Sequence, residues 1–145
     1  MTYVVLDSGI FIASVFLEPY TAQAKHLMKT LQTEQVKFIA PHLLMYELMS
    51  TIRKGVYQGR VLPSDAMRIR DRLLNLPIDL YFDQPLLKRA YDLATDLNRV
   101  RAYDTQFLAL AERFACDFWT TDEKFYHIAH IRYPAVRWVG MYPTT

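Results

Sequence analysis

Glycine is scarce in this sequence. Only four occur among 145 residues: Gly9, Gly55, Gly59 and Gly140. Their spacing matches neither the P-loop motif nor the GxGxxG motif of a dinucleotide-binding fold, and no GxSxG motif is present to carry a serine nucleophile. The sequence therefore contains none of the common glycine-rich phosphate-binding loops. It also lacks the nucleophile motif expected for Ser–His–Asp catalysis.

Cysteine is nearly absent as well. Cys116 is the only one, so no disulfide can form within the chain, and the reducing cytoplasm is the expected location. The first residues lead straight into an apolar strand pattern with no basic or long apolar segment, so we expect neither a signal peptide nor a membrane span. His127 and His130 could share a helix face, but no cysteine or HExxH pattern completes a zinc site.

The net charge is small, at +2, so overall charge does not indicate a nucleic-acid partner. The distribution of charge is more informative, because residues 52–72 carry six basic side chains and two acidic ones. This segment could hold a phosphate backbone, and the alternative is an ordinary solvated helix face. The candidate phosphate-backbone contacts are Arg53, Lys54, Arg60, Arg68, Arg70 and Arg72.

Apolar residues make up 52% of the chain and charged residues 22%, which is typical of a folded chain and, at this length, of a single domain over residues 1–145. Short apolar runs predict strands at 2–7, 36–40, 78–82, 117–121 and 136–139. Longer periodic patterns predict helices at 9–17, 20–33, 42–55, 63–75, 85–98, 104–115 and 123–130, the third ending near Gly55. This alternation predicts an α/β fold with a mostly parallel sheet covered by helices on both faces.

Four acidic residues stand where an unpaired carboxylate is costly. Each lies at the end of a predicted strand or on the buried side of a predicted helix: Asp7, Glu47, Asp104 and Asp122. On a helical wheel Glu47 falls between Leu43 and Leu44, at the edge of the apolar face. Asp7 and Asp122 follow the carboxyl ends of their strands, where parallel sheets bind ligands.

Each acid alone also has a structural interpretation. Asp7, Asp104 and Asp122 could cap the helices that follow them, although Asp104 lacks the partner of a capping box because Phe107 stands three residues later. Glu47 could pair with a nearby arginine. Together, however, four carboxylates at one sheet edge favour a hard divalent cation, Mg²⁺ or Mn²⁺, between them. Without the metal they should repel one another, and some of their pKa values should rise.

The order and context of these acids resemble the PIN domain and, within it, the VapC-type toxin ribonucleases. The resemblance is carried by four segments that span most of the chain: VLDS (5–8), PHLLMYEL (41–48), YDTQFLALAE (103–112) and WTTD (119–122). The last two, close together in sequence, are the most specific. One position departs from the pattern, because the family often has Asn or Ser two residues after its first acid, and here that residue is Gly9.

The resemblance implies a three-layer α/β/α sandwich and endonucleolytic cleavage of RNA by one or two Mg²⁺ or Mn²⁺ ions. The catalytic and metal-binding residues carried over are Asp7, Glu47, Asp104 and Asp122, with Thr120 as a supporting residue. It also implies a homodimer in a toxin–antitoxin pair, in which a small antitoxin protein inhibits the enzyme.

Three other functions compete with this interpretation. A PIN-like domain could bind RNA or a protein without cutting it. A haloacid-dehalogenase phosphatase would need Asp-x-Asp after the first strand, where Gly9 stands instead of the second acid. A receiver domain would need a phosphoacceptor Asp at the end of a middle strand and a lysine later in the chain. The spacing of the acids and lysines here does not match that pattern.

Overall fold

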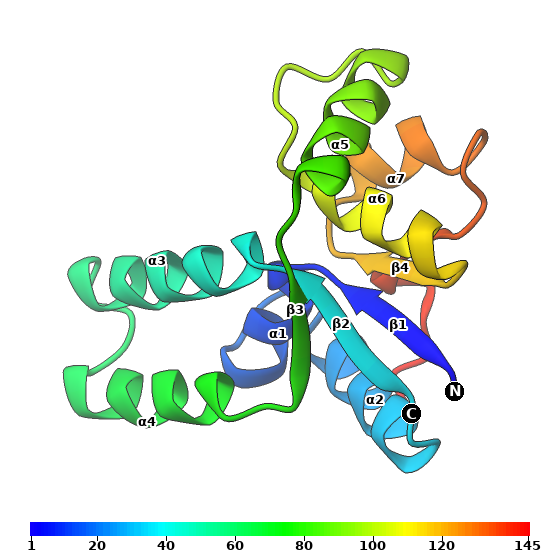
Figure 1. Cartoon of the computed structure of the whole chain (residues 1–145). Helices are drawn as coiled ribbons and strands as arrows, with labels where there is room; N and C mark the ends of the chain where they lie inside the picture. The colour runs from blue at the N-terminus through cyan, green and yellow to red at the C-terminus, as the bar shows by residue number, and fades with distance from the viewer.

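The computed structural model describes all 145 residues and contains one five-stranded sheet in the order β3-β2-β1-β4-β5 (Figure 1). The strands are β1 (Tyr3–Leu6), β2 (Lys37–Pro41), β3 (Ile78–Tyr81), β4 (Asp117–Thr120) and β5 (Val136–Trp138). Every neighbouring pair is parallel, which confirms the predicted sheet. All the connections between strands are therefore crossovers that carry helices onto the faces of the sheet.

Seven α-helices surround this sheet: α1 (Ser8–Val15), α2 (Thr21–Thr33), α3 (Leu43–Tyr57), α4 (Pro63–Leu74), α5 (Gln84–Asp96), α6 (Asp104–Phe114) and α7 (Glu123–Ala129). A short 3₁₀ helix, η1 (Val139–Met141), follows β5. The helices α1 and α2 cover one face and α5, α6 and α7 lie on the other, while α3 and α4 project sideways as an antiparallel arm (Figure 1). This is the predicted three-layer α/β/α arrangement.

The central strand is buried on both faces. Val4, Val5 and Leu6 of β1 are at most 2% exposed, which explains why this segment reads as a continuous apolar run rather than an alternating one. On the α6 side, Phe118 of β4 stacks on Phe107 with ring centroids 5.8 Å apart. This packing fixes α6 against the sheet and so fixes the place of its first residue.

The third helix extends two residues beyond its predicted end. The third helix was expected to end near Gly55, but α3 continues to Tyr57 and turns at Gly59, whose φ is +71°. Gly55 is buried, and a Cβ there would lie 3.2 Å from Cγ1 of Val61. The glycine therefore allows the chain leaving α3 to pack closely against the helix, and it does not terminate it.

The carboxyl ends of the central strands meet at one edge of the sheet. Leu6 pairs with Trp119 in the register of β1 and β4, and the backbone N–H of Asp7 donates to the carbonyl of Trp119 at 3.1 Å. Asp7 thus lies directly beside the end of β4. The chain continues into α1 after β1, into α3 after β2 and into α7 after β4, so the starts of these helices gather around the same edge (Figure 1).

Candidate active site

Asp7 caps α1 and is at the same time tied to the end of β4. One carboxylate oxygen accepts from the backbone N–H of Ile10 at 3.0 Å. The other accepts from the hydroxyl of Thr120 at 2.6 Å and from the backbone N–H of Thr121 at 3.1 Å. Despite these three hydrogen bonds, burial raises the pKa of Asp7 from 3.8 to about 6, and repulsion from Asp104 contributes to the rise.

Thr120 connects the first acid to the last. Its side chain is 2% exposed, its hydroxyl donates to Asp7, and the same oxygen accepts from the backbone N–H of Asp122 at 3.0 Å. Asp122 in turn caps α7 by accepting from the backbone N–H of Phe125 at 3.0 Å. The capping interpretation is therefore confirmed for both Asp7 and Asp122, and it is compatible with a site because helix N-termini favour negative charge.

Glu47 lies in α3, half-buried, with no basic residue paired to it. The pairing of Glu47 with an arginine, the structural alternative, is thus wrong. The pKa of Glu47 is raised from 4.5 to about 7, chiefly by burial and then by repulsion from Asp104 and Asp7, while a hydrogen bond from Ser8 acts in the opposite direction. A half-buried carboxylate without a cation is unfavourable at neutral pH.

Asp104 is the first residue of α6 and does not cap it, since Tyr103 holds the cap position without a side-chain hydrogen bond. Burial raises the pKa of Asp104, and repulsion from Asp122 adds to this, whereas Arg99 lowers it. The guanidinium of Arg99 lies 4.0 Å from the carboxylate. Arg99 was not anticipated, because nothing in its local sequence shows that it turns back toward the start of α6.

The structure brings the four predicted acids together as one electrostatically coupled group, called here the acidic cluster. Repulsion acts between Asp7, Glu47 and Asp104, and between Asp104 and Asp122. As the side chains are placed, no three Asp, Glu, His or Cys residues converge closely enough to hold one metal ion. The donors nevertheless suit a hard divalent cation, because they are acceptor-only oxygens whose mutual repulsion such an ion would relieve.

The departure at Gly9 has a structural explanation. A Cβ added at Gly9 would lie 2.0 Å from the hydroxyl oxygen of Thr121, so the threonine side chain occupies the space that any larger residue would need. Both residues line a hollow of about 320 Å³ together with Ser8, Glu18, Tyr20 and Thr51. A glycine at position 9 thus makes room for the Thr121 side chain, a contact that sequence spacing could not reveal.

The predicted phosphate-backbone contacts do not form one surface. Arg53 and Lys54 line an open hollow on α3 with Met49, Ser50 and Tyr57. Lys54 follows Glu47 by seven residues, which places it on the same helix face about 10 Å away. Arg60 lines a smaller pocket with Glu18 and Thr51.

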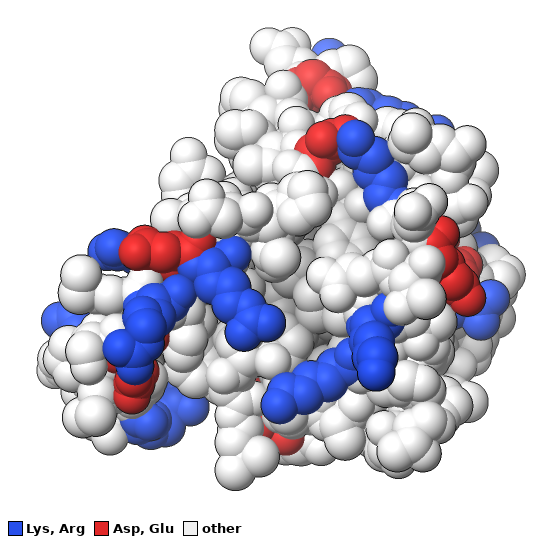
Figure 2. Space-filling model, turned by 90° about the horizontal axis from the view of Figure 1, so that it is seen from below, with Lys and Arg blue, Asp and Glu red and all other residues white.

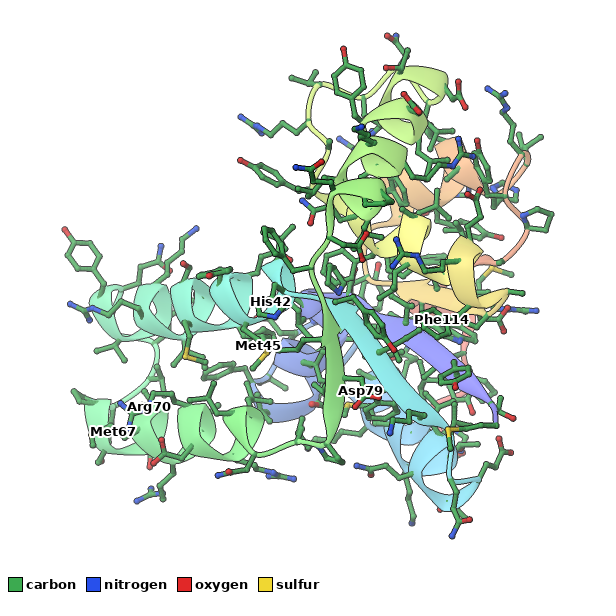
Figure 3. The ribbon with its side chains drawn as sticks, in the orientation of Figure 1. His42, Met45, Met67, Arg70, Asp79 and Phe114 are labelled. Atoms are coloured by element: carbon green, nitrogen blue, oxygen red, sulfur yellow. The ribbon has the colours of Figure 1, made fainter.

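The arginines of α4 lie elsewhere. Arg68 and Arg70 pair with the exposed Asp65 and Asp71, and Figure 3 places Arg70 on α4, within the arm that projects from the sheet. Arg72 lines a groove of about 380 Å³ with Lys25 and Lys29 of α2. Figure 2, seen from below the view of Figure 1, shows several basic side chains on the side where β3 begins, with acidic side chains among them. The acidic cluster instead follows the carboxyl ends of the strands.

Residues 4–131 match the sequence profile of the PIN domain, and the chain therefore belongs to the PIN domain family. PIN domains are generally nucleases that use divalent metal ions. No curated protein matches the chain by sequence.

Two solved structures share the fold. A crystal structure of PAE2754 from Pyrobaculum aerophilum is 19% identical, with 96% of this chain and 92% of that one covered and a TM-score of 0.68. A structure of FitAB bound to the IR36 DNA fragment is 15% identical, with 94% of each chain covered and a TM-score of 0.67. At these identities the likeness shows the fold, which confirms the predicted PIN-like architecture. No helix of the protein has the length and apolar character needed to cross a membrane.

Proposed function

We propose that this protein is a metal-dependent endoribonuclease whose active site is the acidic cluster. The observation that carries the proposal is the gathering of four carboxylates, three of them with raised pKa values, at the carboxyl edge of a parallel sheet. Such an arrangement is unfavourable for folding, and its presence therefore indicates a functional requirement. Membership of the PIN family supports the same conclusion, because PIN domains are typically nucleases.

The residues suit separate roles. Asp7, Asp104 and Asp122 would hold Mg²⁺ or Mn²⁺, with Thr120 fixing the orientation of the Asp7 carboxylate. A bound divalent ion would neutralise the phosphate and lower the pKa of a water molecule. Glu47, with its pKa near 7, is suited either to complete the metal site or to accept a proton from the attacking water at neutral pH.

We further propose that the protein acts in the cytoplasm as the VapC-type toxin of a toxin–antitoxin pair, as a homodimer inhibited by a small antitoxin protein. The single cysteine fits the cytoplasm, and the motifs around the four acids support the VapC-type assignment. The fold shared with FitAB, whose structure is of a complex bound to DNA, is consistent with a partner-dependent role.

The proposal is tested by incubating the purified full chain with RNA and with single-stranded DNA of the same base sequence, in Mg²⁺, in Mn²⁺ and in EDTA. We expect internal cleavage of RNA in either metal and none in EDTA. Equal cleavage of DNA would contradict the ribonuclease assignment. Binding of RNA without cleavage in any metal would favour the alternative function, a PIN-like binding module.

A further inference from the structure

A row of aromatic side chains leads away from the acidic cluster. It begins at Tyr20, which lines the hollow shared with Ser8 and Thr121. The ring of Tyr20 meets the ring of Trp138 nearly at a right angle, with centroids 5.7 Å apart. Trp138 pairs with Thr120 in the register of β4 and β5, so it stands at the same strand edge as the acids.

The row continues into a second hollow, of about 330 Å³, at the outer strand of the sheet. Its lining includes Tyr126, His130 and Trp138. The rings of Tyr126 and His130 stack with centroids 4.4 Å apart and an angle of 13°, and Trp138 lies 6.4 Å from Tyr126. Each of these rings is half-buried and so leaves part of its surface open to solvent, as does Tyr20. The four rings Tyr20, Trp138, Tyr126 and His130 are called here the aromatic strip.

The strip contains an unused hydrogen-bond donor. The indole N–H of Trp138 is the only buried side-chain nitrogen or oxygen in the protein without a hydrogen-bond partner. Buried donors are nearly always paired, because a buried donor without a hydrogen bond is unfavourable. Because this atom is buried, an acceptor on a ligand reaches it only if neighbouring side chains shift.

The charge around the strip suits an anionic ligand. Within residues 123–138 there are three basic side chains, Lys124, Arg132 and Arg137, against one acid, Glu123, and Asp117 of β4 adds a second acid beside Arg137. All three basic side chains are exposed. Arg137 lines the second hollow, where its guanidinium lies 5.8 Å from the ring of Trp119 and also pairs with the Asp117 carboxylate at 2.9 Å. Stacked rings bordered by cations are the usual means of holding single-stranded nucleic acid.

We propose that the aromatic strip binds unpaired bases of a single-stranded RNA segment that extends from the acidic cluster past β5. The inference rests on the proposed nuclease function and adds the surface that would hold the RNA strand and the direction in which that strand leaves the site. Bases must be unstacked to reach aromatic side chains, so a regular RNA duplex cannot use the strip. The alternative interpretation is that these rings only pack against the hydrophobic core. It predicts that replacing them does not change RNA affinity.

The test measures binding separately from cleavage. The full chain carries Asp104→Asn so that RNA stays intact, and the fluorescence anisotropy of labelled single-stranded and duplex RNA is titrated. His130→Ala and Tyr126→Leu should each weaken single-strand affinity by roughly 5- to 100-fold, the range for the loss of one stacking partner. Tyr91→Ala, which deletes a 69% exposed ring on α5, is the matched control and should change nothing.

The outcomes separate the two proposals. Unchanged single-strand affinity in His130→Ala and Tyr126→Leu, with thermal unfolding like that of the parent, overturns the aromatic strip even if the wild type cuts RNA. Equal weakening of single-strand and duplex binding overturns it too. Loss of single-strand affinity in these variants supports the strip even if the wild type cuts nothing, in which case the nuclease proposal alone fails. If Tyr126→Leu unfolds, His130→Ala decides, because His130 lies at the end of α7.

Discussion

Replacing Glu47 with glutamine removes one negative charge from the acidic cluster and keeps the length of the side chain and its acceptor for Ser8. In the folded protein the pKa of Glu47 is raised from 4.5 to about 7, chiefly by burial and then by repulsion from Asp104 and Asp7. The folded state therefore keeps a proton that the unfolded chain releases between about pH 4.5 and 7. Stability must fall as the pH rises through that window, and the glutamine variant must escape the loss.

The magnitude follows from the size of this rise. Each pKa unit corresponds to about 1.4 kcal/mol, so the full effect would be about 3 kcal/mol. Glu47 is partly open to solvent and shares its repulsion with two other titrating groups, which reduces the expected gain to roughly 1–2 kcal/mol above pH 7. For a chain of this length that gain is a rise in Tm of roughly 3–6 °C at pH 8 in EDTA, with no gain near pH 4.

The assay is thermal unfolding of wild type and Glu47→Gln across pH 4–8, in EDTA and in Mg²⁺. Glu34→Gln is the matched control, because it removes the same charge from an exposed position at the end of α2. In Mg²⁺ the wild type should recover most of the difference, since a bound ion relieves the repulsion. An equal Tm for wild type and Glu47→Gln at pH 8 in EDTA would refute the reasoning, as would a gain that is independent of pH.

Three further predictions concern neighbouring residues. Thr120→Val should destabilise the fold by about 1–3 kcal/mol in urea unfolding and slow RNA cleavage, because it leaves Asp7 without its shortest hydrogen bond; unchanged stability and rate would contradict its positioning role. Gly9→Ser should lower the Tm, and adding Thr121→Ala should restore it, because the threonine fills the space above Gly9; additive losses would show that the two side chains do not compete. Lys54→Ala should weaken RNA binding more at low salt than at high salt; an unchanged salt slope would remove it from the phosphate contacts.

The elements and the acids could be predicted because both leave local signals. The strand over Tyr3–Leu6 is an unbroken apolar run because it is buried on both faces, and the helix around Glu47 shows its apolar arc in the spacing of its leucines. Glu47 stood out because its place on that arc makes a carboxylate costly. The three-dimensional grouping of the acids then followed from the rule that parallel strands end at a common edge.

Other features depend on contacts between distant segments and left no local signal. Gly55 resembles a helix end in sequence, yet it is a packing glycine because Val61 returns against the helix. Arg99 reaches the Asp104 carboxylate only because the loop before α6 folds back. Thr121 fills the space above Gly9, which its position 112 residues later in the chain does not suggest. In each case tertiary packing overrides or completes the local pattern.

The most direct test of the central claim is cleavage of mixed cellular RNA by wild type and by Asp104→Asn, each with Mg²⁺ or Mn²⁺ and with EDTA. If the acidic cluster is a metal-dependent nuclease site, the wild type cuts only with metal, and the variant folds at least as stably in EDTA but does not cut. Cleavage by Asp104→Asn at the wild-type rate would contradict the assigned site. A folded wild type, free of any co-purified protein, that cuts nothing with either metal would contradict the nuclease itself.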